Sequence, residues 1–64
     1  MENESLKALL VEAGIPAWAI STNSDGELYI DYTDLETYGD SAKELIMAQD
    51  LIHTDKSLII TAKA

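Results

Sequence analysis

The tetrapeptide Asn23-Ser24-Asp25-Gly26 has the composition of a tight turn, and it separates two segments in which apolar and polar residues alternate. Asparagine suits the first position of a type I turn, and glycine tolerates the positive φ of the bulge that follows such a turn in a hairpin. Alternation with a period of two is typical of strands that bury one face. Residues 17–22 and 27–32 are therefore predicted to form an antiparallel hairpin, around which the rest of the chain must pack.

A helix is predicted before this hairpin, over residues 5–13, because apolar residues recur there at helical spacing. Asn3 or Ser5 is available as its N-cap. Gly14 can adopt the left-handed conformation that ends a helix, and Pro16 prevents the helix from continuing. The apolar stripe of this helix consists of Leu6, Leu9, Leu10 and Ala13.

A second helix is predicted after a turn or short 3₁₀ segment at residues 33–39. The residues from Ser41 to Glu44 have the capping-box pattern, so the helix is expected to begin at Asp40 or Ser41 and to carry its buried stripe as far as Ile52. His53, the single histidine, would follow the end of this helix, where a cation suits the negative end of the dipole.

The β-branched run of residues 57–61 predicts a third strand, which completes the order αββαβ in one domain spanning residues 1–64. A right-handed crossover from the second strand to the third favours the sheet order 2-1-3. We therefore expect an α+β fold with a three-stranded antiparallel sheet and two helices on one face. The side chains expected beneath the helices are Trp18, Ile20, Leu28, Ile30, Leu58 and Ile60.

The chain has twelve acidic residues against four basic ones, a formal net charge of -8. This charge disfavours direct binding to nucleic acid or to an anionic membrane and favours a basic protein surface as partner. The alternative is that the charge only keeps a small protein soluble. No apolar run approaches the roughly 20 residues that span a bilayer, and acids stand where a signal peptide carries Lys or Arg, so a cytoplasmic location is expected.

Neither a catalytic group nor a cofactor or metal is expected from the residue spacing. The turn at residues 23–26 resembles the middle of a calcium-binding loop, but Ser21 and Tyr32 occupy the end positions that need carboxylates. His53 lacks a neighbouring nucleophile and acid in the pattern. A cation held by Asp31 and neighbouring acids remains an alternative, although an enzyme is not predicted.

Two candidate contact surfaces follow from the expected fold. Tyrosines mixed with acids suit a basic protein surface, because aromatic side chains anchor interfaces and carboxylates attract cations. The partner-binding residues predicted on this basis are Glu27, Tyr29, Asp31, Asp34, Glu36, Tyr38 and Asp40. The open face of the sheet is the alternative, as a homodimer contact, since exposed apolar patches often mark association. Its predicted residues are Ala17, Ala19, Tyr29 and Ile59.

The segments 25–32 and 38–46, which read DGELYIDY and YGDSAKELI, resemble the short phage-encoded inhibitors of uracil-DNA glycosylase. The similarity covers the second half of the hairpin and the start of the second predicted helix. Those inhibitors are small, acidic and dimeric, and they imitate DNA to occupy the binding site of the enzyme. The resemblance implies an inhibitor or regulator that presents carboxylates to a nucleic-acid-handling protein.

Overall fold

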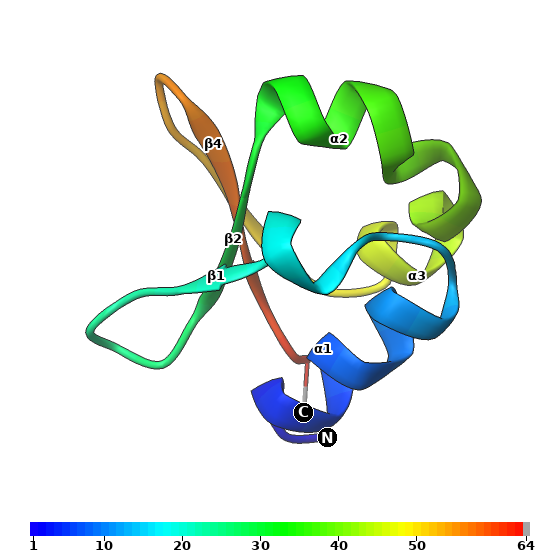
Figure 1. Ribbon diagram of the computed structural model, residues 1–64. Coiled ribbons are helices and arrows are strands. Elements are labelled where there is room, and N and C mark those ends of the chain that lie inside the picture. The colour runs from blue at the N-terminus through cyan, green and yellow to red at the C-terminus, as the bar shows by residue number, and fades with distance from the viewer. Residues whose placement is uncertain (64) are drawn as a thin grey trace.

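The computed structural model describes residues 1–63 and shows an antiparallel sheet of four strands with the helices on one of its faces (Figure 1). The α+β class and the helices on a single face are confirmed. In chain order the elements are α1 (Asn3–Glu12), η1 (Ala17–Ala19), β1 (Ser21–Thr22), β2 (Leu28–Asp31), α2 (Tyr32–Tyr38), η2 (Gly39–Ala42), α3 (Lys43–Met47), β3 (Asp50–His53) and β4 (Ser57–Thr61).

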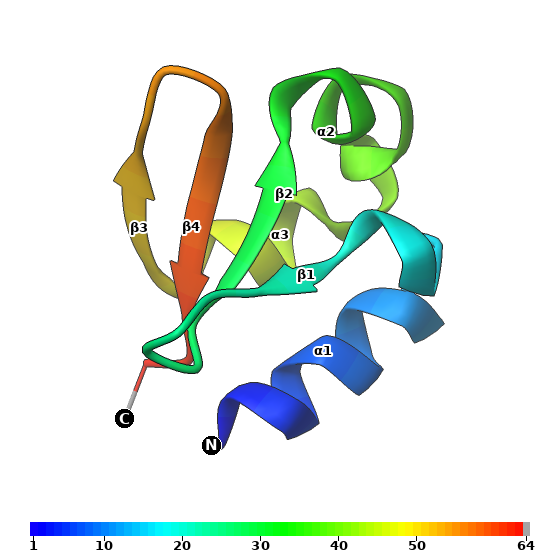
Figure 2. The ribbon, with the colours of Figure 1, turned by 60° about the vertical axis from the view of Figure 1, so that its left-hand side comes forward.

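The strand order is β1-β2-β4-β3, and every neighbouring pair is antiparallel (Figure 2). The predicted order 2-1-3 is wrong, because β2 lies between β1 and β4, in the central place expected for the first strand. The expected three strands are also one too few, since residues 50–53 form β3 at the edge instead of the end of a helix. The helical segment crosses over from β2 to β3, which runs parallel to β2 with β4 between them, and a hairpin then brings β4 into the sheet antiparallel to both.

The end of α1 agrees with its prediction. Gly14 has a φ of 118° and donates its N–H to the carbonyl of Val11, while Ile15 donates to Leu10. These two bonds form a Schellman motif, which folds Ile15 back under the helix until only 1% of it is exposed. The predicted N-caps are wrong, because the cap position is Glu2 and no side chain caps the helix.

The predicted strand 17–22 is wrong over its first half. After Pro16 the chain makes the 3₁₀ turn η1, in which the Ala19 N–H donates to the Pro16 carbonyl at 3.0 Å. This turn reverses the expected facing, so that Trp18 is 69% exposed while Ala19 is 5% exposed. A run of four residues is too short for its period to distinguish a strand from a helical turn. The φ of −59° at Pro16 suits the start of such a turn.

The hairpin turn is confirmed. Gly26 has a φ of 80° and donates to the Asn23 carbonyl at 3.0 Å, while the N–H of Asn23 donates to Glu27 at 2.9 Å. The Oδ1 of Asn23 accepts two further bonds, from the N–H groups of Asp25 and Glu27. The strand that follows buries Leu28 and Ile30, as its alternation predicted.

The second predicted helix is wrong in both its bounds and its cap. Residues 33–39, expected as a turn or short 3₁₀ segment, lie mostly in α2. The chain then continues as the 3₁₀ helix η2 and the short α-helix α3, which ends at Met47. The Oγ of Ser41 donates to the Tyr38 carbonyl at 3.2 Å instead of capping a helix start, because the chain before it is already helical. His53 consequently lies in β3 and not at a helix end.

One core joins the sheet to the helices. Its buried members come from α1, the segment around η1, β2, η2, α3 and β4, and no charged or polar side chain of the described residues is buried with them. They are Leu6, Leu10, Ile15, Ala19, Ile20, Leu28, Ile30, Ala42, Ile46, Leu58 and Ile60.

Candidate functional site

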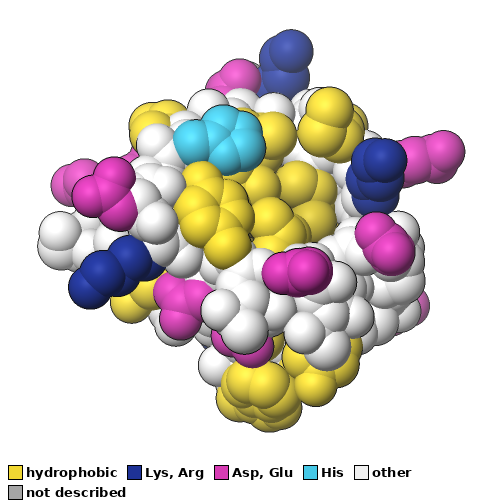
Figure 3. Space-filling view, turned by 90° about the horizontal axis from the view of Figure 1, so that it is seen from above, with side chains coloured by type: hydrophobic (Ala, Val, Ile, Leu, Met, Phe, Trp, Pro, Cys, Tyr) yellow, Lys and Arg dark blue, Asp and Glu magenta, His cyan; other side chains and the backbone are white. Residues whose placement is uncertain are grey.

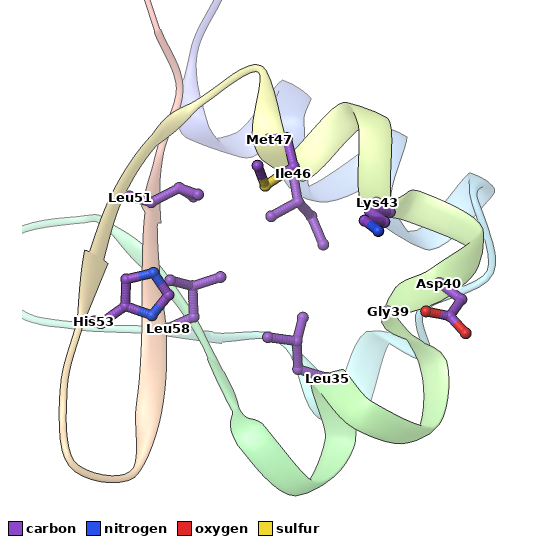
Figure 4. Close-up of a pocket in the computed structure, with 9 residues that line it drawn as sticks. All are labelled: Leu35, Gly39, Asp40, Lys43, Ile46, Met47, Leu51, His53 and Leu58. Atoms are coloured by element: carbon purple, nitrogen blue, oxygen red, sulfur yellow. The ribbon is translucent and has the colours of Figure 1, made fainter.

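An apolar hollow of about 230 Å³ lies between the helical segment α2–η2–α3 and the β3–β4 hairpin. Figure 4 shows Leu35, Ile46 and Leu58 pointing into it from three different elements. Figure 3 shows the same region as a recess floored by apolar side chains beneath the single histidine. The lining is completed by Gly39, Asp40, Lys43, Met47, Leu51 and His53.

The hollow exists because the two walls diverge. The helical segment changes from α2 to η2 and then to α3, so it bends around the recess, while the β3–β4 hairpin extends on the other side (Figures 1 and 4). Gly39 keeps the bend close to α2, since a Cβ at this position would lie 3.0 Å from a methyl carbon of Leu35. Met47 is 67% exposed at the rim, which leaves a flexible apolar side chain available to a partner.

Three polar side chains line this hollow, each from a different element. Asp40 belongs to η2, Lys43 to α3 and His53 to β3. The Nδ1 of His53 lies 3.1 Å from the hydroxyl of Tyr32, and the two rings stack with centroids 6.2 Å apart. The Tyr32 ring therefore positions the imidazole, and the hollow is suited to hold an apolar side chain whose neighbours carry charge.

The seven predicted partner-binding residues are divided between two parts of the molecule. Three of them lie in β2 or directly before it, namely Glu27, Tyr29 and Asp31. The other four lie in α2 and η2, on the face of the sheet that the helices cover. Asp40 alone of the seven lines the hollow. The residues on the helical segment are Asp34, Glu36, Tyr38 and Asp40.

Glu27 has a structural role that its sequence position did not reveal. Its carboxylate accepts a bond from the Thr61 hydroxyl at 2.9 Å and another from the Asn23 side chain at 3.2 Å. The three residues connect the hairpin turn to the end of β4. The carboxylate of Glu27 is thus already hydrogen-bonded within the chain and offers little to a partner.

The four residues predicted for a dimer contact do not all lie together. Tyr29 and Ile59 are cross-strand neighbours on the open face of the sheet, as expected. Ala17 and Ala19 lie apart from them in η1, where Ala19 is buried in the core. Ile52 lies beside Ile59 on this face and is 55% exposed. The sequence pattern does not indicate it, because it continues the buried stripe of the second predicted helix.

Trp18 is an exposed aromatic residue that was predicted to lie in the core. Its ring meets that of Tyr38 edge to face, with centroids 5.9 Å apart and an angle of 88° between the planes. Tyr38 is half-buried against the core and supports the indole from below. The proline before η1 was the one sequence signal that could have indicated this turn.

The acidic residues surround the molecule. Glu27 and Asp34 are half-buried, and every other Asp or Glu is exposed, with representatives on α1, the hairpin turn, η2, α3 and β3. Among residues 1–63 no three His, Asp or Glu side chains converge in a way that could hold a metal ion.

Comparison of the chain with protein-family models, curated proteins and solved structures finds no match. Over the part of the chain that the structure describes, no helix has the length and apolar character needed to cross a bilayer.

Proposed function

We propose that this chain is a small, acidic, non-enzymatic protein that binds a basic protein surface and thereby inhibits or regulates its partner. Its leading partner class is a nucleic-acid-handling protein, to which the carboxylates would present a charge resembling that of DNA. The observation that carries the proposal is that nearly all the acids are exposed, and that one of them, Asp40, lines an apolar hollow. A cytoplasmic location remains part of the proposal.

The arrangement supports charge-driven association in two stages. A net charge of -8 on a chain whose acids are almost all exposed attracts basic surfaces over about 10 Å at moderate salt. An apolar recess then supplies the desolvated contact on which most binding free energy depends. The divided placement of the predicted acids favours overall charge with a local anchor over a single line of phosphate-like groups.

Inhibition of uracil-DNA glycosylase tests the proposal directly, because the sequence resemblance points to that enzyme. We expect the protein to slow uracil release in competition with the substrate. A rising concentration of uracil-containing DNA should therefore restore the rate, and rising salt should weaken the inhibition relative to the enzyme alone. Activity that is unaffected at low salt, or inhibition that neither DNA nor salt relieves, contradicts the proposal for this enzyme. The same assay then extends to other basic DNA-binding enzymes.

Two charge-reversal variants separate the hollow from the charge as a whole. Asp40→Lys and Glu12→Lys each change the net charge from -8 to -6, since each replaces one negative charge with one positive charge. Asp40 lies at the hollow and Glu12 on α1. We expect the Asp40 variant to lose more inhibition than the Glu12 variant, whereas equal losses would mean that the hollow is not involved.

A homodimeric interaction module is the second candidate, and the row Tyr29–Ile59–Ile52 on the open sheet face favours it. In this case the acids serve solubility. Light scattering across a dilution series measures the mass, and Ile59→Asp should convert a sheet-mediated dimer to a monomer. A monomer at every concentration excludes this candidate.

A further inference from the structure

The outer edge of β3 offers backbone groups that have no partner within residues 1–63. The Thr54 N–H donates to the Ser57 carbonyl at 3.0 Å, which makes these two residues a hydrogen-bonded pair of the β3–β4 ladder. In an antiparallel ladder such pairs recur at every second residue, so Ile52 bonds to β4 and its two neighbours turn their N–H and C=O groups outward. The outward groups belong to Leu51 and His53.

The same two residues also line the hollow. The side chains of Leu51 and His53 form its sheet wall, opposite Met47 and Lys43 on α3 (Figure 4). An extended segment paired antiparallel to β3 would place its hydrogen-bonded residues opposite Leu51 and His53, with their side chains on the face of the sheet that holds the hollow. The side chains between them would lie on the open face beside Ile52 and Asp50.

Charge determines what such a segment must be. A second copy of this chain would bring another net charge of -8 to the edge, and like charges oppose that pairing. A segment rich in Lys or Arg is attracted instead, and Asp50 at the start of β3 lies on the open face, where a cationic side chain of the added strand would meet it. The hollow requires apolar residues at the alternate positions.

We propose that β3 accepts an extended segment of a basic partner as a fifth strand, in which apolar side chains cover the hollow and alternating Lys or Arg side chains face the opposite side. This inference rests on the proposed function and specifies its contact. Main-chain bonds would supply affinity, and the alternation of side chains would supply selectivity.

Calorimetric titration with a synthetic peptide in which Lys and Leu alternate tests the pairing, using two N-methylated versions as a matched pair. Methyl groups on the backbone nitrogens of the Leu residues remove the N–H donors that would face β3. Methyl groups on the backbone nitrogens of the Lys residues modify only the outer edge of the added strand. We expect the first to weaken binding by about tenfold or more, since two backbone bonds are lost, and the second to bind as the unmodified peptide does.

Protein variants locate the contact independently. Met47→Ser removes an exposed apolar side chain at the hollow, and Leu9→Ser removes one from α1, away from it. We expect weaker peptide binding only for the Met47 variant. Because both side chains are solvent-exposed, both variants should fold, which far-ultraviolet circular dichroism verifies.

Three outcomes would overturn the inference. Equal affinity for both N-methylated peptides would exclude strand pairing while leaving the proposed function intact, because salt-sensitive inhibition is measured separately. Absence of binding at low salt would exclude the basic segment itself. A dimer in light scattering that neither the peptide nor Ile59→Asp dissociates would show that a second copy occupies the edge.

Discussion

Asn3 joins three parts of the chain through one side chain. Its amide nitrogen donates to the Gly26 carbonyl at 2.9 Å, and its oxygen accepts the N–H of Ala62 at 2.7 Å. The start of α1, the hairpin turn and the residue after β4 are thereby connected, although they are distant in sequence. Nothing in local spacing indicates such a contact, and the sequence suggested only an N-cap.

Replacement of Asn3 with alanine should destabilise the fold by about 1–2 kcal/mol, because both bonds are lost. Asn3→Asp keeps the acceptor for the Ala62 N–H and removes only the donor to the Gly26 carbonyl. The stability of this variant should therefore lie between those of the parent chain and the alanine variant. Urea unfolding measures the difference. An alanine variant as stable as the parent chain would show that these bonds do not contribute.

Gly14 and Gly26 both have positive φ, but only Gly14 is crowded. A Cβ on Gly14 would lie 2.7 Å from the Ser41 Oγ, whereas one on Gly26 would meet nothing within 4 Å. Gly26→Ala should therefore cost about 1 kcal/mol from backbone strain alone, and Gly14→Ala about 2–3 kcal/mol. Thermal unfolding of both variants tests the order of these two values.

Removal of the Ser41 hydroxyl isolates the steric part of the Gly14 effect. In the Gly14→Ala background, Ser41→Ala leaves the Ser41 Cβ at 3.4 Å as the nearest neighbour, an ordinary contact distance. We expect the second substitution to recover part of the lost stability. In the parent chain Ser41→Ala removes only the hydrogen bond to the Tyr38 carbonyl, so an equal loss of stability in both backgrounds would mean that the strain resides wholly in the backbone.

At the scale of elements, sequence patterns predicted best where local chemistry decides the structure. The turn at residues 23–26 and the helix end at Gly14 depend on glycine conformation and short-range bonds, and both are confirmed. The element β3 depends on pairing with β4, and η1 depends on how the chain leaves α1 to reach the sheet. Tertiary contacts determined these two elements, so local propensity did not reveal them.

The candidate site was predicted less well for the same reason. The hollow requires η2 to bend the helical segment and β3 to provide the opposite wall, and both were absent from the predicted fold. The mixture of acids and tyrosines predicted Asp40 as a contact residue but gave no indication of its apolar surroundings. The convergence of Leu35, Ile46 and Leu58 on one hollow could follow only from the correct topology.

The single tryptophan reports whether η1 forms. With 69% of its surface exposed, Trp18 should emit at nearly the wavelength of free tryptophan in water and should be readily quenched by iodide or acrylamide. A residue in the core of a strand would emit at shorter wavelength and resist quenching. Fluorescence therefore distinguishes the turn from the strand that alternation predicted.

For the molecule as a whole, the exposed acids oppose folding through mutual repulsion. Salt screens this repulsion, so the thermal midpoint should rise by several degrees between low salt and about 0.5 M sodium chloride. The Glu12→Lys variant, with a net charge of -6, should show a smaller increase. A midpoint that falls with salt would mean that attractive pairs outweigh repulsion.

The most direct measurement for the contact surface is an amide proton–nitrogen spectrum of the labelled protein, recorded with and without the Lys–Leu peptide. Pairing with β3 predicts that the largest shifts and the slowest new hydrogen exchange occur at Leu51 and His53, with smaller shifts around Met47. The largest changes at Tyr29 and Ile59 on the open face, or none at the edge strand, would contradict the account.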